Sequence, residues 1–251
     1  MSHPNPEDTM AEAPQPSPEQ LANPRRPLSR RLILDEAIAA IDENGLDSLT
    51  MRSLGARLGV EAMALYRYVN GREDLLEGLV GTLVDQIRVD PEDHLAPIDG
   101  WQGFLQWMAH SVRKIATDHP AIFPLVATRH PAAPWLRPPL RSLRVVEEFL
   151  DGLTERGFTD QQAVTAYRIF TSFLLGHLLL EASARGASTA PVEEPLDEGD
   201  AHIPSPSQSV EVSDYPTILR TAPMLAEDHT QDEFESSLEA LLDRLDRVLS
   251  Q

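Results

Sequence analysis

The chain has 251 residues, 21 basic and 40 acidic side chains, and a formal net charge of −19. This length allows two unequal domains, and no apolar run reaches the roughly 18 residues that a membrane span needs. Cysteine is absent, which excludes disulfides, thiolate metal ligands and a cysteine nucleophile. The first residues lack the basic and apolar segments of a secretory signal, so we expect a cytoplasmic protein.

The charge is unevenly distributed along the chain. Residues 1–24 contain four acidic residues and no basic one, and their Pro-, Glu- and Ser-rich composition predicts a disordered tail. Residues 25–72 contain eight arginines and six acidic residues, whereas acidic residues dominate from 73 onward. A polyanion is therefore attracted to residues 25–72 and repelled by the rest of the chain.

The first helix is predicted over residues 30–44, with Ser29 as N-cap and Gly45 as its C-terminal stop. Ile33, Ala37, Ile38 and Ile41 share one face of it.

A second helix follows Thr50, a candidate N-cap, and ends at Gly59. The third is predicted over residues 61–69, with Leu65 and Val69 facing inward and Met63 and Arg67 outward. Three short helices separated by these breaks form a helix-turn-helix module.

The rest of the chain also has a helical pattern. Residues 73–90 predict a connecting helix, with Glu73 and Asp74 in its favourable first turn. Further helices are predicted over about 100–117, 120–128, 138–156, 160–184, 215–226 and 231–250. Residues 186–214 are acidic and rich in Pro and Ser, which is typical of a mobile loop. The fold class is therefore all-α.

The stretch from Ile33 to Leu76 resembles the DNA-binding domain of TetR-family transcriptional repressors. The resemblance is carried by GLDSLTMRSLGARLGV, LYRYV and NGREDLL. It implies a DNA-binding domain over residues 25–72 and an effector-binding and dimerisation domain over 73–251. A ligand-responsive repressor of this kind binds a palindromic double-stranded operator as a homodimer, and its effector lowers operator affinity.

In the family the third helix enters the major groove, which implies the roles of individual residues here. Arg52 is expected to pair with a guanine through its guanidinium. Ala62, Met63 and Ala64 can contact thymine methyl groups, and Tyr66, Arg67 and Tyr68 can bind phosphates or bases. Thr50 and Arg72 are expected to bind the DNA backbone at two helix N-termini. Arg57 is expected to form a surface ion pair.

The later helices resemble the ligand-binding domain of the tetracycline-repressor branch, through Trp101-Gln102, Phe104-Leu105, Ala127-Thr128-Arg129, Arg156-Gly157-Phe158 and Leu175-Gly176. Alignment to this branch gives seven candidate effector-binding residues: Met108, Val112, Leu125, Thr128, Tyr167, Thr171 and Leu175. The branch's metal-ligating histidine is replaced here by Leu125, and Leu180 beside Glu181 stands near its metal-facing acid. We therefore expect no metal or cofactor, and an apolar effector such as a polycyclic metabolite or drug.

Residues 231–250 carry an apolar stripe, Phe234, Leu238, Leu241, Leu242, Leu245, Val248 and Leu249. Such a stripe packs against other helices, either within the chain or between two chains. The resemblance favours a dimer interface formed by residues 160–184 and 231–250.

Two other classes of function fit the sequence less well. An enzyme is disfavoured because no HExxH, GxSxG, P-loop or GxGxxG pattern is present, so no catalytic residue is assigned. His177 and Glu181, spaced i and i+4, are the one pair suggestive of metal or acid–base chemistry, and a structural histidine is the more ordinary interpretation. The other alternative is a helical interaction protein whose helix-turn-helix binds protein.

Overall fold

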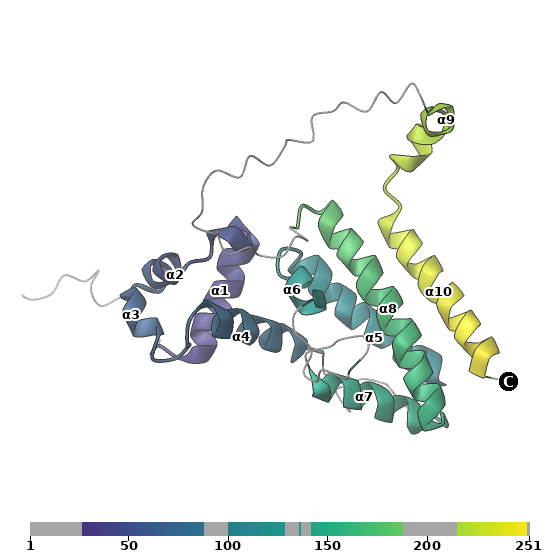
Figure 1. Ribbon diagram of the computed structural model, residues 1–251, viewed down its shortest axis with the longest axis horizontal. Helices are drawn as coiled ribbons and strands as arrows, with labels where there is room; N and C mark the ends of the chain where they lie inside the picture. The colour runs from purple at the N-terminus through teal and green to yellow at the C-terminus, as the bar shows by residue number, and fades with distance from the viewer. Residues whose placement is uncertain (1–26, 88–99, 129–135, 137–141, 188–214, 250–251) are drawn as a thin grey trace, which may run out of the picture.

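The computed structural model describes residues 27–87, 100–128, 136, 142–187 and 215–249, and over these residues the secondary structure is entirely helical. Figure 1 shows a small group of helices, α1 to α4, beside a larger group that contains α5 to α8 and α10. The tail predicted over 1–24 and nearly all of the loop predicted over 186–214 lie outside the described residues. The all-α prediction is confirmed.

Helix α1 spans Arg30–Asn44, as predicted. The Ser29 hydroxyl accepts a hydrogen bond from the Leu32 amide, which satisfies one of the free N–H groups at the helix start. Gly45 ends the helix at φ 80°, where a side chain is disfavoured, and its amide donates to the Ile41 carbonyl. The predicted apolar face is buried.

Helix α2 spans Met51–Leu58 and begins with a reciprocal cap between Thr50 and Ser53. Gly59 closes it in the left-handed conformation, as expected from its lack of Cβ. A short 3-10 turn, Leu46–Ser48, connects α1 to this helix.

Helix α3 is shorter than the predicted 61–69, because regular α-helix covers only Ala62–Leu65. The chain continues as turns, in which the amides of Tyr68 and Val69 both donate to the Leu65 carbonyl. Arg30 donates to the Tyr68 carbonyl at 2.8 Å and directs the chain toward the start of the next helix. The predicted inward residues, Leu65 and Val69, are buried nonetheless.

Helix α4, Arg72–Val84, connects the two groups of helices. Its leucines, Leu75, Leu76, Leu79 and Leu83, are buried, and it contacts α1 and α6. At Gly78 the backbone lies so close to α1 that a Cβ atom would stand 2.7 Å from Leu34 Cδ2. A second link between the groups is the 2.8 Å contact of His119 Nδ1 with Asp42 Oδ2.

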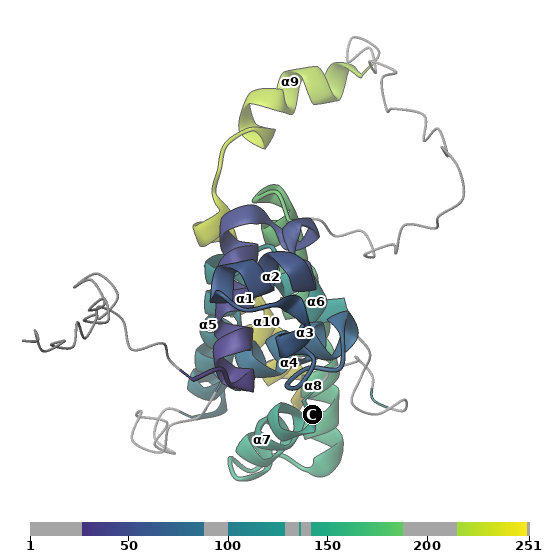
Figure 2. The same cartoon turned by 90° about the vertical axis from the view of Figure 1, so that its left-hand side faces the viewer.

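The larger group is arranged around α8, which contacts α5, α6, α7 and α10. These helices span Gly100–Asp118 (α5), Phe123–Thr128 (α6), Leu143–Thr154 (α7), Asp160–Ala184 (α8) and Thr230–Leu249 (α10). Helix α8 is long and apolar enough to cross a membrane by length and composition alone. Part of its apolar surface is buried against these four neighbours. Helix α9, Pro216–Leu225, lies away from this group (Figures 1 and 2).

The apolar stripe of α10 is covered in part by its own chain, and the dimer interface favoured over residues 160–184 and 231–250 stays a prediction. Phe234, Leu238, Leu242 and Leu245 are buried within this one chain, so the intramolecular alternative holds for these four residues. The Phe234 ring lies against His110 of α5 and against His177 of α8. Three-and-four spacing specifies an apolar face without specifying which helix covers it, and that is why the sequence left both alternatives open.

Candidate nucleic-acid interface and ligand cavity

The residues predicted to read DNA run from the N-cap of α2 through α3 and the turns that follow to the first residue of α4, at the end of the molecule remote from α10 (Figure 1). Met63 is 74% exposed, and Tyr66 and Tyr68 are 46% and 37% exposed, so none of the three is part of the core. The side chains of Thr50, Arg52 and Arg67 are exposed, and those of Ala62, Ala64 and Arg72 are half-buried. We call these nine residues the reading face.

The reading face is held in place by a close crossing of α2 and the start of α3. Leu54 and Leu65 are buried beneath it. Gly55 lies so close to the turn that a Cβ there would stand 2.9 Å from the Val60 carbonyl oxygen and 3.2 Å from the Ala62 nitrogen. The Val60 amide also donates to the Gly55 carbonyl at 2.9 Å. This position therefore admits only glycine without moving the backbone.

Arg57 lies on α2 but is engaged within the protein. Its guanidinium donates to Glu36 at 2.9 Å and to both carboxylate oxygens of Glu43 at 2.6 and 2.8 Å. These contacts confirm the predicted surface ion pair. They also tie α2 to α1, so the arginines left to face solvent on the reading face are Arg52 and Arg67.

Asp74 ties the start of α4 to both α1 and the end of the reading face. It accepts two hydrogen bonds from Arg30, at 2.6 and 2.9 Å, and a third from the Asn70 amide at 2.7 Å. The Arg30 hydrogen bonds and then the Asn70 amide hold the pKa of the Asp74 carboxyl down at about 2. The same arginine binds the Tyr68 carbonyl, so one ion pair fixes three segments.

We expect Asp74→Asn to lower the free energy of unfolding by about 1 kcal/mol at neutral pH, a modest value because solvent screens a partly exposed pair. A carboxyl with a depressed pKa stabilises the fold above its unfolded pKa of about 3.9, and this stabilisation is lost as the pH falls toward 2. Urea unfolding at about pH 6 and about pH 3 should therefore show the difference between wild type and variant shrink at the lower pH. Asp35→Asn, which removes the exposed partner of Arg31, is the control, and an equal pH response from both variants would contradict the assignment.

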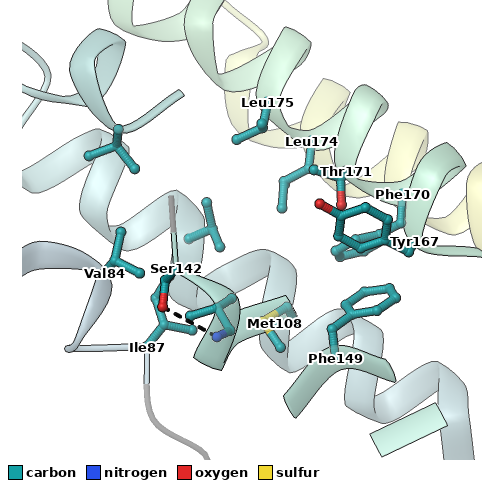
Figure 3. A pocket seen from close by; sticks show the side chains of 13 residues that line it. Val84, Ile87, Met108, Ser142, Phe149, Tyr167, Phe170, Thr171, Leu174 and Leu175 are labelled. Atoms are coloured by element: carbon teal, nitrogen blue, oxygen red, sulfur yellow. Dashed lines mark hydrogen bonds between the residues drawn. The ribbon is translucent and has the colours of Figure 1, made fainter. Parts of the chain in front are cut away.

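A cavity of about 590 Å³, counted with its open mouth, lies within the larger group of helices (Figure 3). Its walls come from the end of α4 and from α5, α6, α7 and α8. The lining residues are Val84, Ile87, Met108, Val112, Val126, Ser142, Val145, Phe149, Tyr167, Phe170, Thr171, Leu174 and Leu175.

The cavity wall is apolar, and none of these lining residues carries a charged side chain. The Phe149 ring lies 5.6 Å from the Tyr167 ring and 5.5 Å from the Phe170 ring, which gives one side an aromatic surface. The polar side chains are the hydroxyls of Ser142, Tyr167 and Thr171, and burial raises the pKa of Tyr167 to about 12, so it stays neutral. This lining suits a neutral, largely apolar molecule with a few hydrogen-bonding groups.

Five of the seven predicted effector-binding residues line this cavity: Met108, Val112, Tyr167, Thr171 and Leu175. The other two do not. Leu125 is buried elsewhere, and the Thr128 hydroxyl donates back to the Pro124 carbonyl within α6. Val84 and Ile87 were not predicted from the sequence, and their apolar character at the end of α4 was the available signal.

His177 and Glu181 do not form the pair suggested by their spacing. The His177 ring lies against Phe173 and Phe234. Glu181 is buried and binds Arg113 through both carboxylate oxygens at 3.2 Å, and Arg185 at 2.9 Å. Arg113 also donates to Gln231 of α10 and lies 4.4 Å over the Phe234 ring. This polar cluster joins α5, α8 and α10, and the described residues contain no group of three or more possible metal ligands.

The fold, the reading face and the cavity define a class, the bacterial regulators that join a helix-turn-helix to a helical ligand-binding domain. Residues 33–79 match the family described as bacterial regulatory proteins, tetR family, and residues 95–249 match the tetracyclin repressor-like C-terminal domain. The chain belongs to the TetR family of transcriptional regulators. It is a ligand-responsive, DNA-binding regulator, and this is a family of regulators and not of enzymes.

Individual relatives agree with this assignment. The class D tetracycline repressor of Escherichia coli is 31% identical over 166 residues, which cover 64% of this chain and 70% of that protein. A possible TetR-family regulator from Streptomyces coelicolor A3(2) is 29% identical, with a TM-score of 0.64 over 88% of this chain and all of that one. The S. coelicolor protein ActR in complex with actinorhodin shares the fold, with a TM-score of 0.60 and 21% identity over 87% of this chain and 95% of that one.

Proposed function

We propose that this protein is a cytoplasmic repressor that binds a palindromic operator as a homodimer and is released from it by a neutral, largely apolar small molecule. In this proposal residues 25–72 bind DNA and residues 73–251 bind the effector and dimerise. The connecting helix predicted over 73–90 corresponds to α4, which ends earlier, at Val84. The single observation that carries the effector class is the uncharged lining of the cavity. A charged effector would lose its hydration there without gaining a partner.

The reading face supplies the chemistry for DNA binding. Arg52 and Arg67 are exposed cations within residues 25–72, where eight arginines outnumber six acidic residues. Met63, Ala62 and Ala64 offer apolar contacts suited to thymine methyl groups. Thr50 and Arg72 stand at the starts of α2 and α4, and a helix N-terminus favours a phosphate, which supports a backbone-binding role for both.

Support for the dimer comes from apolar side chains of α8 that face solvent. Leu180 is 76% exposed and Val164 is 37% exposed, although the helix is otherwise a core element. Gly176, one turn before Leu180, has open space where a Cβ would lie, so a second helix can approach closely. A palindromic operator follows from this symmetry, because a two-fold dimer presents two equivalent reading faces.

Arg52→Ala is expected to weaken operator binding by about 5- to 150-fold, the value of one good bidentate contact to guanine. The free energy of unfolding and the oligomeric state should stay as in the wild type, because the Arg52 side chain is exposed. Fluorescence anisotropy with the operator measures the loss. Lys114→Ala is the matched control, since it removes one positive charge from an exposed ion pair on α5. Equal affinities for wild type and Arg52→Ala would rule out Arg52 as a base-reading residue.

A further inference from the structure

The end of α4 is part of the cavity wall. Val84 is the last residue of the helix, and Val84 and Ile87 both line the cavity. The final carbonyls of a helix lack the amide partners that a longer helix would supply. The Val84 carbonyl accepts the Ile87 amide at 3.0 Å and takes a second donor from another helix.

Arg144, near the start of α7, binds the end of α4. Its Nη2 donates to the Val84 carbonyl and to Asp85 Oδ1, and its Nη1 donates to the Ile87 carbonyl, each at 3.2 Å. Nη1 also donates to Glu148 Oε1 at 2.7 Å. A guanidinium is suited to this arrangement because its planar fork presents several donors at fixed angles and its charge favours a helix C-terminus.

The same arginine stands between two other residues of the cavity wall. Ser142 and Val145, which flank Arg144 in the chain, line the cavity from the start of α7. Figure 3 shows Val84, Ile87 and Ser142 on one side of the cavity, across from Tyr167 and Phe170. Arg144 therefore joins two elements that a ligand between these walls would contact.

The other end of α4 is fixed to the DNA-binding helices. Asp74 binds Arg30 of α1, and Gly78 allows α1 to approach within van der Waals contact. Displacement of one end of a regular helix moves its other end as well. A movement at Arg144 is thus carried toward the reading face.

We propose that Arg144 is a positioning residue that makes the end of α4 follow α7, so that filling of the cavity is transmitted to the DNA-binding helices. This inference rests on the proposed ligand response. Arg144 is not among the residues that line the cavity, and its contribution is its hydrogen bonds to the Val84 and Ile87 carbonyls.

The test is hydrogen–deuterium exchange followed by mass spectrometry, with and without the neutral fluorophore N-phenylnaphthylamine as the cavity probe. The full chain is compared as wild type, Arg144→Gln and Glu148→Gln. Glu148→Gln is the matched control, because it removes the ion pair and keeps the donors for both carbonyls. Fluorescence titration gives the affinity of each protein for the probe.

We expect the probe to change exchange in α4 and in residues 30–70 of the wild type and of Glu148→Gln. In Arg144→Gln the probe should bind within about threefold of wild-type affinity, while the change in residues 30–70 is lost. An equal change in Arg144→Gln would overturn the role of Arg144 and leave the ligand response intact. The proposed ligand response, and this inference with it, would be contradicted if the wild-type protein did not bind the probe. The same holds if it bound the probe with no change of hydrogen–deuterium exchange in α4.

Discussion

Gly55→Val is expected to abolish specific operator binding, with a loss on the order of 100-fold or more, because several base contacts are displaced together. Even a bare Cβ at this position would stand 2.9 Å from the Val60 carbonyl oxygen and 3.2 Å from the Ala62 nitrogen. Val60 lies in the turn between the two helices and Ala62 begins α3, so the reading face must move. Overpacking of this kind also costs about 1–3 kcal/mol of stability. Anisotropy with the operator and urea unfolding measure the two effects.

Gly81→Ala is the matched control for that variant. Gly81 lies within α4, and no atom lies within 4 Å of the position that a Cβ would take there. Alanine should stabilise the protein by about 0.5–1 kcal/mol, since it lowers the backbone entropy of the unfolded chain. Near-wild-type operator affinity in Gly55→Val would show that the crossing of α2 and α3 does not set the reading face.

Glu181→Ala should produce the largest loss of stability, about 3–5 kcal/mol, because it leaves the Arg113 guanidinium buried without its carboxylate partner. Both side chains are more than nine-tenths buried, and their pairing joins α5 to α8. Since Arg113 also reaches Gln231 and Phe234, we expect α10 to loosen as well. Urea unfolding followed by circular dichroism measures the change.

Two comparisons make the Glu181 prediction specific. Asp118→Ala breaks the exposed Lys114–Asp118 pair and should cost less than about 0.5 kcal/mol. The double variant Arg113→Met, Glu181→Met removes both charges and should lose less stability than Glu181→Ala. If Glu181→Ala unfolds at the same urea concentration as Asp118→Ala, the buried pair does not hold α5 to α8.

The sequence was most informative where a single residue type decides local structure. Ser29 and Thr50 cap α1 and α2 because a hydroxyl in the N-cap position accepts a hydrogen bond from a free backbone amide. Gly45 and Gly59 end these two helices at positive φ. The buried face of α1 followed from its apolar spacing. These features are local, so the pattern alone predicts them.

Features that depend on tertiary contacts were not predictable in this way. Helix α3 ends early where Arg30, 38 residues away in the chain, binds the Tyr68 carbonyl. Four residues of the α10 stripe are covered by their own chain, and Ile87 lines the cavity together with Ser142 and Val145 from the start of α7. The nine residues of the reading face and the assignment of the effector stay predictions.

Selection of genomic DNA fragments on the purified protein, followed by titration of the recovered site at two salt concentrations, tests the central claim most directly. We predict recovery of a palindromic site, bound by a dimer, with affinity falling steeply as salt rises because bound counterions are displaced from the phosphates. Recovery of only sequence-independent, salt-sensitive binding would contradict the role proposed for the reading face.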